Sequence, residues 1–428
     1  MLDGTQILGM NARNRLYLPY NSKKGRMIAD SKILMKKRLA KCGLPVPGLI
    51  KVFRTSQEIF DFDWLTLPDN WVLKPCSGFG GAGILVIKKK AKYAGEWILM
   101  DGTKINIGDL RLQALDILAG QYSLHDLPDL AFIEERIKIR GLFYKLAYQG
   151  TPDIRVIVFN KVPVMAMLRL PTPESKGKAN IHQGAIAVGI DLATGITMAG
   201  VLRGEIITEI PWSGKRLTGL KLPEWSKILT LAVKVQEFIP EMGYMGVDIV
   251  LDKERGPMVL EINARPGLEI QNANLMPLKK RLERIEGLEI INAEHGVRVA
   301  KALFAGRYAD RVMAEEGIKI INGEEKVRVV GLNEKTETIL ARIDTGATRS
   351  SIDKELAKKL GMLKKENILW KDTYRSAVGV QPRPIVGFHY WLAGRKIKST
   401  ASVIDRSKMK YPVLVGRNDL GGFLVRAA

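Results

Sequence analysis

The stretch that decides the fold is Gly246-Val-Asp-Ile-Val-Leu-Asp252, followed by Lys253-Glu-Arg-Gly256 and by Pro257-Met-Val-Leu-Glu-Ile-Asn-Ala-Arg-Pro-Gly267. Both outer segments are rich in apolar and β-branched residues, which are typical of β-strands. The connection between them is polar and contains a glycine. We therefore expect a β-hairpin.

The register of this hairpin brings three oxygen-bearing side chains together. If Asp252 pairs with Pro257, counting back along the ladder places Asp248 opposite Glu261, with Asn263 two residues further on and on the same face. Two carboxylates that face each other across a ladder repel, unless a divalent cation lies between them. Oxygen ligands suit Mg²⁺ or Mn²⁺, which usually take one or two carboxylates together with substrate phosphates. The alternative is a surface hairpin whose acidic residues are incidental.

The composition predicts a soluble cytoplasmic protein of two or three domains. The chain has 428 residues, of which 46% are hydrophobic, and this is more than one ordinary domain needs. It contains no run of about 18 apolar residues, and its first residues lack the apolar segment of a secretion signal, so no membrane partner is expected. The two cysteines, Cys42 and Cys76, exclude a disulfide framework and fit a reducing compartment.

Positive charge is concentrated in the last quarter of the chain. The net charge is +22, and from Lys319 onward there are 22 Lys and Arg against 11 Asp and Glu. Such an excess suits nucleic acid, an anionic surface or a polyanionic substrate. The sequence has no pair of CxxC motifs, no RNP-like aromatic strand and no long basic helix, so nucleic acid is the less favoured of these partners. A solvated basic face is the alternative for most of these lysines.

Three features before residue 90 suit an anionic ligand. Lys32 begins a short cationic helix expected between Asp30 and Gly43, and Lys74 lies in the predicted strand Asn70–Pro75. A glycine-rich loop, Cys76–Gly83, and a second strand follow, and such a loop lets backbone N–H groups approach phosphate oxygens. The G-x-x-x-x-G-K-[ST] pattern is absent and no helix follows, which excludes a Walker loop and a Rossmann turn. An ordinary turn flanked by surface lysines is the alternative.

Further polar residues accompany the strands that follow. The predicted strand Ala131–Ile137 runs into a hinge, where Glu134 or Glu135 could meet a ribose hydroxyl and backbone groups a purine edge. The strand Asp153–Phe159 starts with charged residues, and its partner strand carries Arg169 near its end. Each of these strands is ordinary by itself.

The order of these parts closely resembles the ATP-grasp superfamily over about residues 5–300. The most specific motifs are Leu73-Lys-Pro75 with Gly80-Gly-Ala-Gly83, Asp153-Ile-Arg155, Asn180-Ile-His-Gln-Gly184, and Gly246-Val-Asp248 with Glu261-Ile-Asn-Ala-Arg-Pro-Gly267. Within the superfamily the chain resembles the alpha-L-glutamate ligase-like members, relatives of the enzymes that add glutamates to a ribosomal protein tail. This resemblance implies an α+β fold in which two subdomains grip ATP.

The resemblance also implies a role for each motif residue. The implied nucleotide-binding residues are Lys32, Lys74, Gly80, Gly81, Gly83, Glu134, Glu135, Ile137 and Asn180. The implied catalytic arginines, which would face the transferred phosphate, are Arg155 and Arg169. The implied ligands of Mg²⁺ or Mn²⁺ are Asp248, Glu261 and Asn263. In the implied reaction ATP phosphorylates a carboxylate and an amine displaces the phosphate, with metals and cations stabilising the charge and no Ser or Cys nucleophile.

The pattern changes to short strands from Lys326 onward. Strands are predicted over Val327–Leu332, Thr338–Ile343, Arg383–Leu392, Lys396–Ile404 and Tyr411–Val415. Within them stand Ile343-Asp-Thr-Gly-Ala347 and Pro412-Val-Leu-Val-Gly-Arg-Asn418. This pair of motifs resembles one half of a retropepsin-type aspartic protease, most closely the small proteins called ATP-dependent zinc proteases. The resemblance implies an all-β barrel in residues 319–428, after an ATP-grasp ligase domain in residues 1–318.

In that class two aspartates, one from each half, share a proton. The sequence has a single Asp-Thr-Gly, so Asp344 could be catalytic only in a homodimer. Zinc has little support, because His389 is the only histidine in this part and there is no cysteine. The alternative is a barrel that presents a basic surface to an acidic peptide or tail.

The expected function is that of an ATP- and Mg²⁺-dependent carboxylate–amine ligase. It would join glutamate or another acidic amino acid to a peptide or small acceptor, such as an acidic protein tail. Two alternatives stay open, namely a bifunctional ligase and aspartic peptidase, and a C-terminal module that docks acidic tails or nucleic acid.

Overall fold

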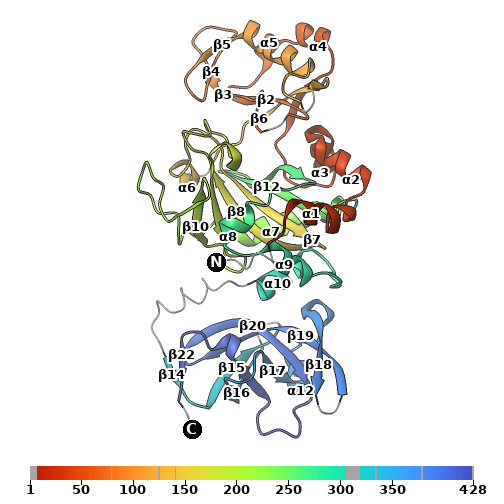
Figure 1. The fold of residues 1–428 in the computed structure, drawn as a ribbon, viewed down its shortest axis with the longest axis vertical. Helices are drawn as coiled ribbons and strands as arrows, with labels where there is room; N and C mark the ends of the chain where they lie inside the picture. The colour runs from red at the N-terminus through yellow and green to blue at the C-terminus, as the bar shows by residue number, and fades with distance from the viewer. Residues whose placement is uncertain are drawn as a thin grey trace. The chain divides into compact units, whose positions relative to one another are not determined.

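The computed structural model describes residues 7–78, 80–123, 126–139, 141–304, 319–332, 335–376 and 379–426. The chain forms two compact units (Figure 1): unit 1 comprises Met1–Ile190 and Gly195–Arg284, and unit 2 comprises Asp191–Thr194 and Ile285–Ala428. The predicted domain boundary after residue 318 lies at the end of a segment outside the described residues, and it stays a prediction. In the described part of the chain no helix is long and apolar enough to cross a membrane.

Unit 1 begins with short helices, α1 (Met10–Leu16), α2 (Lys23–Asp30) and α3 (Lys32–Lys41). The predicted cationic helix is therefore present as α3. Ser31 caps this helix, since its hydroxyl accepts a hydrogen bond from the backbone N–H of Leu34. This cap places Lys32 in the first turn of α3 and Lys36 one turn later on the same face.

The first sheet of unit 1 has six strands in the order β1-β6-β2-β3-β4-β5. Their bounds are β1 (Leu49–Phe53), β2 (Trp71–Pro75), β3 (Leu85–Lys90), β4 (Glu96–Leu99), β5 (Lys104–Asn106) and β6 (Ala131–Glu135). Helices α4 (Ser56–Asp61) and α5 (Ile107–Leu118) pack against it. Trp64, Trp71 and Trp97 are at most 1% exposed in the core between them. This core holds β2 and β6, which carry Lys74 and Glu134, in place.

The second sheet of unit 1 has seven antiparallel strands in the order β11-β10-β9-β8-β7-β12-β13. Their bounds are β7 (Asp153–Phe159), β8 (Val162–Leu170), β9 (Ile186–Ile190), β10 (Thr197–Leu202), β11 (Glu205–Ile207), β12 (Tyr244–Asp252) and β13 (Gly256–Asn263). Helix α7 (Trp225–Phe238) packs against β7, β8, β12 and β13. Shorter helices are α6 (Gly141–Tyr144), α8 (Ile270–Asn274) and α9 (Leu278–Glu283).

The decisive hairpin is β12–β13, and the predicted pairing of Asp248 with Glu261 is confirmed. The observed register differs from the predicted one in two places. Asp252 pairs with Gly256 and not with Pro257, and an irregularity between Asp248 and Ile249 restores the offset by one residue. Gly256, with φ of 76°, closes the tighter turn, because few residues other than glycine adopt this conformation readily.

Unit 2 contains a closed β-barrel. Six strands follow one another in the order β15-β16-β21-β17-β20-β19, and β19 pairs back to β15, while β18 extends the sheet beyond β19. Their bounds are β15 (Glu324–Val330), β16 (Thr336–Asp344), β17 (Ser350–Asp353), β18 (Ile368–Ser376), β19 (Gly379–Leu392), β20 (Arg395–Ile404) and β21 (Val413–Gly416). A separate parallel pair joins β14 (Lys319–Ile321) to β22 (Phe423–Val425). The predicted order of an α+β part and a small all-β barrel is confirmed.

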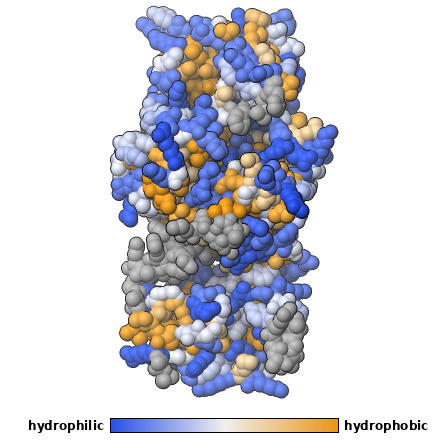
Figure 2. Space-filling model, in the orientation of Figure 1, coloured by the Kyte–Doolittle hydropathy of each residue, from blue (hydrophilic) through white to orange (hydrophobic). Residues whose placement is uncertain are grey.

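Two α-helices lie in the described residues of unit 2. Helix α12 (Lys354–Lys359) packs against β17 and β20, and α10 (Ala293–Leu303) packs against β18. On the face shown in Figure 2, hydrophilic side chains surround separate apolar patches, as expected for a chain with 26% charged residues.

Candidate functional site

Two arginines and two aspartates form a cluster on the neighbouring strands β8, β7 and β12. Arg155 lies beside Asp248 in the ladder and donates from Nε to Oδ1 at 2.7 Å and from Nη2 to Oδ2 at 2.6 Å. Arg169 binds Asp153 in the same bidentate way, at 2.6 and 2.7 Å, and its Nη2 also donates to Oδ2 of Asp248 at 2.7 Å. Both guanidinium groups therefore reach the same carboxylate oxygen and are held in one orientation.

The cluster is buried and its formal charges balance. Asp248 is 0% exposed, and Arg155 and Arg169 are 8% and 9% exposed. Burial disfavours the ionised form of Asp248, but the two arginines hold the pKa of its carboxyl well below its usual range. Burial, reinforced by the charge of Asp248, raises the pKa of Asp153 although Arg169 opposes this. Asp153 is therefore the first of the two carboxyls to take up a proton as the pH falls.

A second buried cluster joins helix α3 to the first sheet. Glu134, which is 1% exposed, forms ion pairs with Lys74 at 2.5 Å and with Lys36 at 2.7 Å. Burial lowers the pKa of Lys36, whereas Lys74 and Lys36 hold the pKa of Glu134 below its usual value in spite of burial. The neighbouring Glu135 is exposed and pairs with Arg255 at 2.7 Å. In this structure Glu134 is turned toward the lysines, and the predicted ribose contacts of both glutamates stay predictions.

Lys32 contacts the backbone at the start of the glycine-rich loop. Its Nζ donates to the carbonyl oxygens of Cys76 at 3.3 Å and Gly78 at 3.1 Å. Gly80, Gly81 and Gly83 of this loop have positive φ, and a side chain at Gly83 would collide with Tyr122, since a Cβ atom there would lie 2.5 Å from its ring. The loop conformation therefore depends on glycine.

The loop also meets the segment that carries Asn180. A Cβ atom at Gly80 would lie 3.0 Å from Nε2 of Gln183 and 3.4 Å from Nδ2 of Asn180, and one at Gly81 would lie 3.4 Å from Lys178. Asn180 caps a short turn, since its side-chain oxygen accepts from the N–H of His182 at 3.1 Å. The structure thus places two predicted nucleotide-binding features, the glycine loop and Asn180, next to each other.

The predicted hinge contacts the tip of the β12–β13 hairpin. Ile137 is buried in an apolar cluster with Val250, Met258 and Leu260. The backbone N–H of Lys138 donates to Asp252 at 3.0 Å, and the N–H of Lys253 donates to the carbonyl of Lys138 at 2.7 Å. These contacts fix the hinge against the hairpin, and the predicted role of Ile137 in binding the nucleotide stays a prediction.

The predicted metal ligands lie together on the hairpin, but they differ in whether their oxygen atoms still have lone pairs for a metal ion. Oδ2 of Asp248 accepts from Arg155, from Arg169 and, at 3.2 Å, from Nδ2 of Asn263, and this exhausts its lone pairs. Glu261 and Oδ1 of Asn263 are hard oxygen donors on partly exposed residues, and they fit Mg²⁺. Among the described residues no three His, Cys, Asp or Glu side chains could hold a metal ion. A cation here would therefore complete its shell with phosphate oxygens and water.

Two residues of these clusters were missed in the sequence analysis. Lys36 was assigned no role, although it lies four residues after Lys32 and hence on the same helical face. Asp153 was quoted only as part of a motif, although it lies two residues before Arg155 and hence on the same face of β7. Their separation in sequence from Lys32 and Arg155 could have identified both residues. It could not have shown which charges they neutralise.

In unit 2 the Asp-Thr-Gly motif begins at Asp344, the last residue of strand β16. Asp344 pairs with Gly416 across the parallel strands β16 and β21. Its Oδ1 accepts from the N–H groups of Gly346 at 2.8 Å and Ala347 at 3.0 Å. The backbone of Arg417 donates to the carbonyl of Ala347 at 2.8 Å, so the two predicted motifs lie together.

A comparison with protein families matches residues 11–287 to the family described as sugar-transfer associated ATP-grasp. The matched segment is more than half of the chain and contains both sheets of unit 1. The chain belongs to this family. Unit 1 therefore contains an ATP-grasp domain, the ATP-binding fold of a class of ligases, and the predicted ATP-grasp resemblance is confirmed.

Solved structures similar to the ATP-grasp chain share little sequence with it. The ATP-grasp ligase PsnB complexed with a minimal precursor is 14% identical, with a TM-score of 0.32, and the match covers 62% of each chain. PsnB complexed with a phosphomimetic precursor variant, Mg and ADP is 14% identical, with a TM-score of 0.31, and 60% of that chain is covered. The match therefore spans about three fifths of the PsnB chains.

A third similar structure is the protein Lpg0085, of unknown function, from Legionella pneumophila subsp. pneumophila str. Philadelphia 1. It is 20% identical with a TM-score of 0.18, and the match covers 25% of this chain and 92% of that one. No curated protein matches the ATP-grasp chain. The glutamate ligase-like subtype and the retropepsin-like character of the barrel stay predictions.

Proposed function

We propose that the ATP-grasp domain is an ATP- and Mg²⁺-dependent carboxylate–amine ligase that works through an acyl phosphate. The observation that carries this proposal is the pair of guanidinium groups of Arg155 and Arg169, oriented by Asp153 and Asp248 on the face that also bears Glu261. An acidic amino acid such as glutamate is the proposed substrate, on the basis of the motifs of the glutamate ligase-like members, and a peptide or small molecule is the proposed acceptor. The family description, which refers to sugar transfer, leaves the acceptor open.

The chemistry follows from the charge that the reaction develops. The γ-phosphoryl group moves from ATP to a carboxylate oxygen, the amine then attacks the carbonyl carbon, and phosphate leaves. Arg155 and Arg169 would orient the transferred group and stabilise its charge, while Lys74 would bind phosphate oxygens. Glu261 and Asn263 would hold Mg²⁺, which when bound neutralises phosphate charge.

The test measures ADP release and product mass for the purified full-length protein with ATP, Mg²⁺, single amino acids and short acidic peptides. The expected product is heavier than the acceptor by one residue, that is, the added amino acid less water. Glu261→Ala is expected to abolish it, while Glu254→Ala, at the exposed tip of the same hairpin, is the matched control. ATP binding and turnover that survive Glu261→Ala unchanged would contradict the assignment of this site.

A second candidate function is peptide cleavage by the barrel. It is supported by Asp344, whose Oδ1 accepts two backbone hydrogen bonds beside the Gly416-Arg-Asn segment. Such an activity would need two chains to supply two aspartates. Cleavage of the ligase product that is lost in Asp344→Asn, in a protein shown to be dimeric by sedimentation, would support it. Cleavage by a monomer would contradict it.

A further inference from the structure

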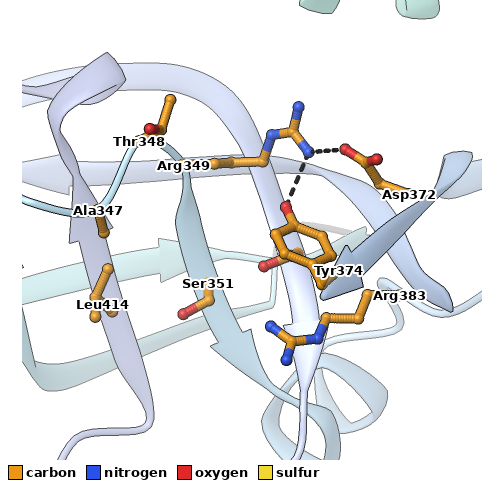
Figure 3. Close-up of a pocket in the computed structure, with 9 residues that line it drawn as sticks. Ala347, Thr348, Arg349, Ser351, Asp372, Tyr374, Arg383 and Leu414 are labelled. Atoms are coloured by element: carbon orange, nitrogen blue, oxygen red, sulfur yellow. Dashed lines mark hydrogen bonds and ion pairs between the residues drawn. The ribbon is translucent and has the colours of Figure 1, made fainter. Parts of the chain in front are cut away.

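Unit 2 has a cavity beside the segment that follows Asp344. It has a volume of about 470 Å³ and is lined by residues of strands β17 to β21 and of the loop before β17, namely Ala347, Thr348, Arg349, Ser351, Asp372, Tyr374, Arg383, Ser402 and Leu414. This volume is sufficient for a small ligand or for one or two amino-acid side chains. Figure 3 shows that Arg349 extends toward Asp372 and Tyr374, which belong to strand β18.

The cavity contains more cationic than anionic groups. Arg349 is paired with Asp372, from Nη1 to Oδ2 at 2.8 Å, and it also donates to the Tyr374 hydroxyl at 3.1 Å. Asp372 is the only carboxylate in the described lining. Arg383 has no carboxylate within ion-pair distance among the described residues, and its buried Nε has no hydrogen-bond partner there. The guanidinium group of Arg383 therefore has no carboxylate to neutralise it among the described residues of the cavity.

A further cation, Arg406, lies behind the cavity wall. Nη1 of Arg406 donates to the hydroxyl of Ser351, a lining residue, at 2.9 Å, and Nε of Arg406 donates to the carbonyl of Tyr411 at 2.8 Å. Because Ser351 accepts from Arg406, its own hydroxyl hydrogen is free to point elsewhere, and Ser402 offers another hydroxyl donor. The wall thus presents hydroxyl donors that are backed by positive charge.

We propose that this cavity binds a carboxylate of an acidic peptide, with Arg383 as its principal partner. A planar guanidinium group recognises a planar carboxylate by two parallel hydrogen bonds, and the neighbouring hydroxyl donors add to them. The aromatic rings are less suited to stacking a nucleic-acid base. The Arg383 guanidinium lies 4.7 Å from the ring centre of Tyr374, and that of Arg349 lies 5.4 Å from Trp370, so one face of each ring is already covered.

The proposal concerns a site in unit 2 and goes beyond the ligase reaction proposed for unit 1. It also does not need Asp344, since binding a carboxylate requires no proton transfer. The probe is fluorescein-labelled hexaglutamate, added to the full-length protein without ATP, and its fluorescence anisotropy reports binding. Hexaglutamine carries the same label as the uncharged reference.

Three substitutions localise the binding. Arg383→Gln is expected to weaken hexaglutamate binding by about tenfold or more, as for the loss of a hydrogen bond to a charged group. Lys358→Gln removes the same charge from the exposed face of α12 and is expected to change binding by less than about twofold. Asp372→Asn removes the carboxylate of the cavity and is expected to tighten binding several-fold, a gain that misfolding cannot produce.

Competition experiments distinguish carboxylates from other anions. Unlabelled glutarate is expected to displace the probe at a lower concentration than inorganic phosphate. The proposal is overturned if Arg383→Gln and Lys358→Gln weaken binding equally, if Asp372→Asn does not tighten it, or if phosphate competes as well as glutarate. Tighter binding of single-stranded RNA than of hexaglutamate at the same site, detected by its loss in Arg383→Gln, would assign the cavity to nucleic acid instead.

Discussion

The two units use arginine in opposite ways. In unit 1 Arg155 and Arg169 are buried and neutralised by Asp153 and Asp248, so each guanidinium group has one orientation. In the cavity of unit 2 Arg383 has no carboxylate partner among the described residues. Pairing costs a cation some of its attraction for anions, but it provides a defined direction, which a phosphoryl transfer requires. An unpaired arginine at a cavity wall keeps its full attraction for an anionic ligand.

Removing Asp248 should destabilise unit 1, because its paired arginines lose a carboxylate. Asp248→Ala leaves Arg155 buried without its carboxylate, and loss of one partner of a buried ion pair costs about 3–5 kcal/mol. We therefore expect the free energy of unfolding to fall by about that amount and ligase turnover to be lost, as measured by urea denaturation and ADP release. Glu205→Ala, at an exposed position of β11 in the same unit, is the control. A loss below about 1 kcal/mol would show that water or other groups neutralise the arginine.

The Lys36–Glu134–Lys74 cluster offers a second and milder test. Glu134→Gln keeps the shape but removes the charge that both lysines share, and we expect a loss of about 2 kcal/mol, as for a hydrogen bond to a charged group. A second substitution, Lys36→Met, should recover part of this loss in the Glu134→Gln protein, because an apolar side chain suits a position that is 2% exposed. Urea denaturation of the single and double variants measures both effects. Additive losses would contradict the assigned coupling.

Ligand binding at the two sites should depend differently on salt concentration. Attraction between an anionic ligand and cations near the surface is screened by salt, whereas a buried, paired cluster is screened much less. Between about 50 and 500 mM NaCl we expect hexaglutamate binding to weaken several-fold and the KM for ATP to change less. Anisotropy titrations and steady-state ATP kinetics at constant Mg²⁺ concentration measure the two responses. Equal responses would mean that both sites rely on diffuse surface charge.

The sequence predicted parts of the site whose placement depends on local periodicity. Because side chains alternate along a strand, the pairing of Asp248 with Glu261 could be counted, and a compensating bulge preserved it. The ion pairs could not be counted, because they join residues far apart in the chain, such as Lys36 with Glu134. The barrel strands between Thr338 and Val415 were predicted in part, but β17 and β18 were missed, since charged and polar residues interrupt their apolar pattern.

A smaller effect concerns pH and distinguishes the two units once more. His295 of α10 accepts from the N–H of Ile291 at 3.2 Å on Nδ1 and lies 2.9 Å from the carbonyl of Ile368 on Nε2, which describes a neutral imidazole with its proton on Nε2. Burial lowers the pKa of His295 below its ordinary value of 6.5. The unfolded state therefore binds the proton more readily than the folded state.

From this sign we expect unit 2 to be fully stable above about pH 6.5, the ordinary pKa of histidine, and to lose stability as the pH falls below it. Thermal unfolding followed between pH 7.5 and about pH 5 measures the slope, and His295→Asn should reduce it. His389, whose pKa is lowered by burial and by Lys398 and Lys396, stays in both proteins as a common background. The cluster in unit 1 should act in the opposite direction through Asp153, because the raised pKa of this carboxyl lets the folded state bind a proton more readily than the unfolded state, while the arginines keep Asp248 ionised over the whole range. An unchanged slope in His295→Asn would mean that the imidazole accepts its proton without leaving the contact with Ile368.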